Sequence, residues 1–92
     1  MGLDKVNSPT SGTITTVSLS ANTWTAVATG LSNIISWELV CREGYAFDYA
    51  YEDSPTHYRT NGGTGVSKDA ATTQVYARCA TACTMELEFW KL

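Results

Sequence analysis

Polar and apolar residues alternate along most of this chain with a period of two, which predicts β-strands that are half buried. The alternation is clear in residues 34–42 and in residues 84–90, where Glu86 and Glu88 separate apolar neighbours. The side chains that the pattern predicts to face a core are Ile35, Trp37, Leu39, Val75, Ala77, Met85, Leu87 and Phe89.

Turn-forming residues divide this alternation into short segments. Strands are expected at residues 13–19, 23–29, 34–42, 45–52, 72–79 and 84–90, with a short strand at 58–60 and a brief strand or helical turn at 66–71. Seven or eight short strands without an amphipathic helix are typical of a sandwich or jelly roll. The sequence therefore predicts an all-β chain with an extended N-terminal arm at residues 1–11 and one antiparallel β-sandwich or jelly-roll domain at residues 12–92.

Composition agrees with this fold class and excludes others. Threonine and aromatic residues are abundant, hydrophobic residues make up 43% of the chain, and charged residues make up only 16%. β-Branched and aromatic residues favour strands, while the residues of exposed helices are scarce. A helical bundle and a coiled coil are excluded, and the low net charge of −3 argues against disorder.

The distribution of charge limits the partners. Six basic and nine acidic residues are scattered without a basic stripe, so neither nucleic acid nor an anionic membrane is an expected partner. Residues 1–5 carry no apolar core of a signal peptide, and three cysteines are an odd number, so we expect synthesis in a reducing cytoplasm. No charged residue occurs between Lys5 and Glu38, which suits a surface that another protein covers.

The residue types that carry chemistry form no recognisable catalytic or metal-binding pattern. His57 is the one histidine, and no nucleophile motif accompanies it, so an enzyme is not expected. Cys79 and Cys83 are four residues apart, unlike zinc ribbons, and a second ligand pair is lacking, so neither a metal nor a cofactor is expected. The two cysteines either pack as small apolar side chains or face each other across a hairpin and form a disulfide under oxidation.

The aromatic residues are the one group of side chains for which the sequence suggests a functional role. Tyr45, Phe47, Tyr49 and Tyr51 share one face of a predicted strand, where they fill a core, form a subunit interface or provide a platform for a ligand. For contacts with a partner or another subunit, the sequence nominates Leu3 and Val6 of the arm together with Tyr45, Tyr49, Tyr51 and Trp90.

Several segments together resemble a family of small bacteriophage virion proteins with a β-sandwich fold. The resemblance is carried by residues 19–31, the strand at 37–42, residues 47–50 with Tyr58, residues 75–78 and the terminal segment at 87–90. It implies a non-enzymatic capsid decoration or cement protein, often trimeric, that binds the major capsid protein or another virion protein and resides in the virion. The alternative is a tail or fibre module, or a glycan-binding β-sandwich that uses an aromatic platform.

Overall fold

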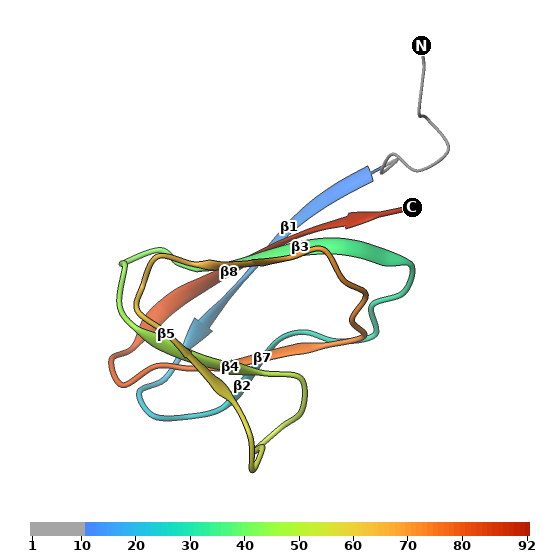
Figure 1. Cartoon of the computed structure of the whole chain (residues 1–92). Coiled ribbons are helices and arrows are strands. Elements are labelled where there is room, and N and C mark those ends of the chain that lie inside the picture. Colours follow the sequence, from blue (N-terminus) through green and yellow to red (C-terminus); the bar gives the residue numbers. More distant parts are fainter. Residues whose placement is uncertain (1–10) are drawn as a thin grey trace.

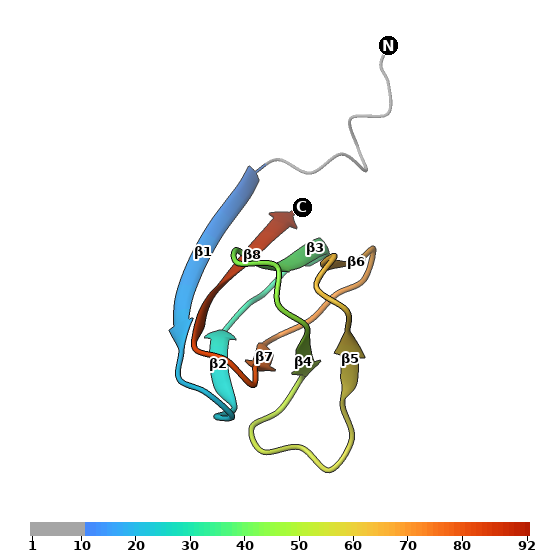
Figure 2. The same ribbon diagram turned by 90° about the vertical axis from the view of Figure 1, so that its left-hand side faces the viewer.

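The computed structural model describes residues 11–92, which form eight β-strands in two four-stranded antiparallel sheets (Figure 1). The first sheet has the strand order β1-β8-β3-β6 and the second sheet has the order β2-β7-β4-β5, as Figure 2 shows from the side. The strands are β1 (Ser11–Leu19), β2 (Thr25–Ala28), β3 (Ile34–Cys41), β4 (Phe47–Ala50), β5 (Arg59–Asn61), β6 (Val66–Lys68), β7 (Val75–Arg78) and β8 (Cys83–Lys91).

This arrangement confirms the predicted all-β fold, a small β-sandwich with the expected number of strands. In the segment at 66–71, for which the sequence predicts a brief strand or a helical turn, residues 66–68 form strand β6. No helix long and apolar enough to cross a membrane occurs in residues 11–92. The predicted arm lies outside the described residues except for Ser11, with which β1 begins.

The core lies between the two sheets and draws on the inward-facing side chains of both. Strand β8 shows the alternation most clearly, because Met85, Leu87 and Phe89 are buried while the intervening residues are less so. The other buried apolar side chains include Trp37 and Leu39 of β3, Phe47 and Tyr49 of β4, and Val75 and Ala77 of β7. Burial of this apolar set is the main favourable term in folding a domain of this size.

One predicted core position is wrong. Ile35 is half buried, whereas its neighbour Ile34 is only 3% exposed and belongs to the core. The reason is a shift of register against β8, where Ile34 pairs with Lys91 and Ser36 pairs with Trp90. Two steps along β3 therefore match one step along β8, as in a β-bulge, and the inward face changes from odd to even positions at the start of the strand.

Candidate functional site

The predicted aromatic stripe divides between the core and the surface. Strand β4 covers only residues 47–50, so Phe47 and Tyr49 point inward, and Tyr49 is 6% exposed. Tyr45 and Tyr51 lie beyond the two ends of the strand and are 42% and 49% exposed. Tyr49 is thus a core residue, and its nomination for intersubunit contact is corrected, while Tyr45 and Tyr51 remain accessible to a partner.

Trp90 and the start of β1 form an exposed aromatic patch on the first sheet. Trp90 is 39% exposed and pairs across the strands with Gly12. A Cβ atom placed on Gly12 would lie 2.6 Å from the Trp90 ring, so only glycine lets the indole lie flat over the neighbouring strand. Leu3 and Val6, also nominated for partner contact, lie outside the described residues.

Strand β1 is a long edge of the first sheet, and within residues 11–92 only β8 pairs with it. It spans nine residues and carries no charged side chain. Its first four residues are exposed, and Ile14 is 63% exposed; only Leu19 at the other end is buried. A long uncharged edge with free backbone donors and acceptors is a template for pairing with another strand.

A row of directly opposed residues crosses the outer face of the first sheet next to this edge. Ile14 of β1 faces Glu88 of β8, Glu88 faces Glu38 of β3, and Glu38 faces Ser67 of β6. We call these four residues the glutamate row. Two like charges directly opposite one another destabilise a sheet, so a positive group from a partner is the natural complement of this row.

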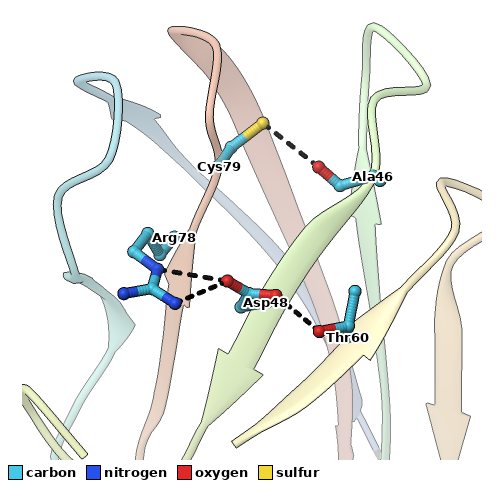
Figure 3. Close-up of polar contacts among 5 residues, drawn as sticks. All are labelled: Ala46, Asp48, Thr60, Arg78 and Cys79. Carbon is cyan, nitrogen blue, oxygen red and sulfur yellow. Dashed lines mark hydrogen bonds and ion pairs between the residues drawn. The ribbon is translucent and has the colours of Figure 1, made fainter.

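The outer face of the second sheet carries an ion pair that joins its strands β4 and β7. Asp48 of β4 accepts hydrogen bonds from the Arg78 guanidinium at 2.8 and 3.1 Å and from the Thr60 hydroxyl at 2.7 Å, joining three strands (Figure 3). The Arg78 guanidinium also lies over the rings of Trp24 and Tyr58, 4.7 and 4.9 Å from their centroids. These groups satisfy one another and leave no free charge for a ligand.

A shallow pocket of about 360 Å³ opens beside this network, and its lining includes Tyr51, His57, Tyr58, Arg59 and Lys68. His57 is hydrogen bonded to the adjacent Thr56 hydroxyl at 3.1 Å. Partial burial of the Tyr51 side chain raises its pKa above the ordinary value, and the nearby Tyr49 adds a smaller increase. Aromatic rings with basic neighbours in an open pocket are suited to hold a polar ring such as a sugar.

The two cysteines that sequence analysis singled out are joined by a third. Cys41 at the end of β3, Cys79 just after β7 and Cys83 at the start of β8 are all buried free thiols, and we call them the thiol cluster. The Cys79 thiol donates to the Ala46 carbonyl at 3.3 Å (Figure 3). The Cys79–Cys83 disulfide therefore remains a prediction for oxidising conditions, with Cys41 as a competing neighbour.

Glu43 completes this region. The Sγ atoms of Cys41 and Cys83 and a carboxylate oxygen of Glu43 all lie within 4.8 Å of one another. The Thr84 backbone N–H donates to Glu43 at 3.0 Å and lowers the pKa of that carboxyl. Burial, and then hydrogen bonding with Cys41 and Cys79, raises the pKa of the Cys83 thiol. Sequence spacing missed Cys41 and Glu43 because strand pairing, and not a local motif, brings them to Cys83.

The chain was compared with protein-family models, with curated proteins and with solved structures, and no match was found in any of the three.

Proposed function

We propose that this chain is a structural protein of a bacteriophage virion, a capsid decoration protein that binds the capsid lattice and stabilises it through protein–protein contacts. The observation that carries the proposal is strand β1, a nine-residue edge without charge. A soluble domain that stays monomeric usually protects such an edge with charge, proline, a bulge or a short length. None of these protections is present in Ser11–Leu19.

The chemistry around β1 supports a protein partner. Ile14 and Trp90 present exposed apolar area next to the free edge, and Glu38 and Glu88 present negative charge beside them. Strand addition supplies main-chain hydrogen bonds, while flanking side chains select the partner. The expected partner, the major capsid protein or another virion protein, therefore offers an unpaired strand with basic side chains next to it.

A lattice suits a contact of this size. One strand edge and two apolar side chains give a weak interface by themselves, but many copies, or a homotrimer with three such edges, bind with high avidity. The proposal therefore includes a homotrimer. Sedimentation of the purified chain measures the mass of this trimer directly. Association also adds stability to a domain with a small core.

The proposal is tested by adding the protein to expanded capsid shells and measuring bound protein and the unfolding temperature of the shells. We expect saturable binding and a higher unfolding temperature. Saturated binding with unchanged shell stability would contradict the cement role, and absence of binding would contradict the decoration role altogether.

The glutamate row offers a matched pair of variants for this test. Ile14→Lys and Ser67→Lys each add one positive charge opposite a glutamate, at the two opposite edges of the same sheet. Both are expected to fold, because a lysine opposite a glutamate is a favourable pair. We expect Ile14→Lys to weaken shell binding by at least about tenfold, and Ser67→Lys, at the far end of the glutamate row, to weaken it by less than about threefold. Equal effects would mean that β1 is not the contact.

A second function is favoured by the pocket at Tyr51 and Tyr58, which suits a glycan held by a tail or fibre module. The ring centroids of Trp24 and Tyr58 are 5.5 Å apart, so the fluorescence of Trp24 reports on the pocket. This hypothesis predicts a saturable, sugar-dependent change in tryptophan fluorescence that Tyr51→Ala abolishes. A Tyr45→Ala control, with a similarly exposed tyrosine outside the pocket, should retain the change. No change across a panel of host glycans would exclude the function.

A further inference from the structure

Donors for a soft metal ion converge at one end of the sandwich. Cys41 ends β3, Cys83 begins β8, and Glu43 lies in the turn that follows β3. Antiparallel pairing of β3 with β8 continues past the strand ends, because the Arg42 N–H donates to the Thr84 carbonyl at 2.9 Å. This pairing holds the three donor side chains on neighbouring strands and directs them to one point.

The distances between these donors are close to those of a tetrahedral metal site. Zinc bonds of about 2.3 Å to sulfur and about 2.1 Å to oxygen place neighbouring donors roughly 3.5–3.8 Å apart. The Cys41 Sγ and a Glu43 oxygen are 3.7 Å apart, and all three donors lie within 4.8 Å of one another. Closure around an ion therefore requires a movement of about 1 Å, which side-chain rotation supplies.

Cys79 lies outside this group of three donors. Its thiol is buried and donates to the Ala46 carbonyl at 3.3 Å. It follows β7 of the second sheet, whereas Cys41 and Cys83 belong to the first.

The surroundings of Glu43 resemble those of a ligand that is already oriented. Its carboxylate accepts a hydrogen bond from the Thr84 N–H at 3.0 Å, which fixes the direction of the side chain. Glu43 is exposed while the three thiols are buried, so it marks the path by which an ion would enter. Sulfur donors select zinc over magnesium or calcium.

We propose that Cys41, Cys83 and Glu43 bind one Zn²⁺ ion. The two thiols release their protons on binding, and a water molecule completes the four-coordinate shell. The ion would act as a staple between β3 and β8 of a small domain whose core alone gives modest stability. This site is independent of the contact surface on β1, since it lies at the opposite end of that strand, where Leu19 pairs with Cys83.

The test uses the full chain, reduced with a phosphine and freed of metal with a chelator that is then removed. Titration with Co²⁺ should saturate at one ion per chain and produce the intense visible and near-ultraviolet bands of tetrahedral thiolate coordination. Zn²⁺ should displace these bands and raise the unfolding temperature. Absence of the thiolate bands, or binding of more than one ion with no effect on unfolding, would overturn the proposal.

Variants assign the ligands. We expect Cys83→Ala to weaken Co²⁺ binding by more than about 100-fold, and Glu43→Gln to weaken it by about tenfold. Glu52→Gln, which removes an exposed carboxylate elsewhere, should leave binding unchanged. Cys41→Ala provides a second thiol variant if Cys83→Ala fails to fold. Binding that survives both thiol substitutions would overturn the site, as would a mass two hydrogens lower in protein purified without oxidant, since that mass indicates a disulfide.

Discussion

Strands β1 and β6 are the two edges of the same sheet, yet they are built differently. Strand β6 has three residues, ends in Lys68 and is followed by Asp69, so it is short and charged. Strand β1 has nine residues and no charge, and its first half projects with most of its side chains exposed. One edge carries the usual protections against pairing and the other carries none.

The contrast with β6 shows that a long, uncharged edge such as β1 is not a general consequence of a small sandwich. The edges of the second sheet, β2 and β5, have four and three residues, so three of the four edges are short. Its length therefore already distinguishes β1 from the other three edges. Because residues 6–37 carry no charge, β1 also lacks the charged side chains that usually protect a strand edge. We infer from both that β1 is the contact strand.

The largest effect is expected at β8, which pairs with the edge strand β1 and with the central strand β3. Leu87 of β8 pairs with Thr15 of β1 and Leu39 of β3, and it is fully buried. Leu87→Ala should lower the free energy of unfolding by about 2–5 kcal/mol, because it removes transfer energy and leaves a cavity. Chemical denaturation measures this value. A loss below about 1 kcal/mol would show that the interior tolerates the cavity and is not the tightly packed core described above.

Gly12→Ala should act on the β1 edge alone. The new methyl group would collide with the Trp90 ring, which must move, at a cost of about 1–3 kcal/mol. We expect a shift in tryptophan emission and loss of the shell contact. Gly62→Ala, at a position with open space around the added carbon, is the control and should change neither. An unchanged emission spectrum for Gly12→Ala would mean that Trp90 does not lie over the strand.

Alkaline pH should lower the free energy of unfolding through Cys83, which pairs with Leu19 at the buried end of β1. Burial raises the pKa of Cys83, so above pH 9.0 the unfolded chain loses a proton that the folded chain keeps. Stability therefore falls as pH rises, with a slope of up to about 1.4 kcal/mol per pH unit, and is independent of this group below pH 9. Denaturation with a chelator present between pH 8 and 10 measures the slope. Cys83→Ala should abolish it; an equal slope in that variant would refute the assignment.

The smallest effect is expected in the second sheet, away from both compared edges. Asp48→Asn removes the charge that pairs with Arg78, while the side chain still reaches Thr60. Because the pair is partly exposed, we expect a loss of about 1 kcal/mol in thermal or chemical unfolding. Binding through β1 should be unaffected. A change in shell binding that exceeds the change in stability would place the contact surface on the second sheet.

Much of the fold follows from local pattern, and most of the candidate sites do not. Alternation places Met85, Leu87 and Phe89 inward because β8 is long, central and regular. It fails at Ile35 because a bulge depends on the partner strand, which a single sequence does not reveal. The pattern predicts one face from Tyr45 to Tyr51, but β4 ends after four residues and leaves its outer tyrosines in loops.

The thiol cluster shows the same limit more sharply. Cys79 and Cys83 are close in the sequence, so their proximity is predictable, whereas Cys41 approaches Cys83 only through the pairing of β3 with β8. The inward position of Cys41 was predictable from its alternation with Trp37 and Leu39. Its proximity to Cys83 was not, because contact between distant strands is set by topology and register.

Hydrogen exchange at the backbone amides of β1 tests the account most directly. Exchange is measured for the free protein and for the protein bound to capsid shells, and peptides covering β1 and β6 are compared. If β1 is the contact strand, its exposed first half gains protection on binding while β6 is unchanged, because new main-chain hydrogen bonds form at one edge only. Protection that rises at β6, or binding that leaves β1 unprotected, would contradict the central claim.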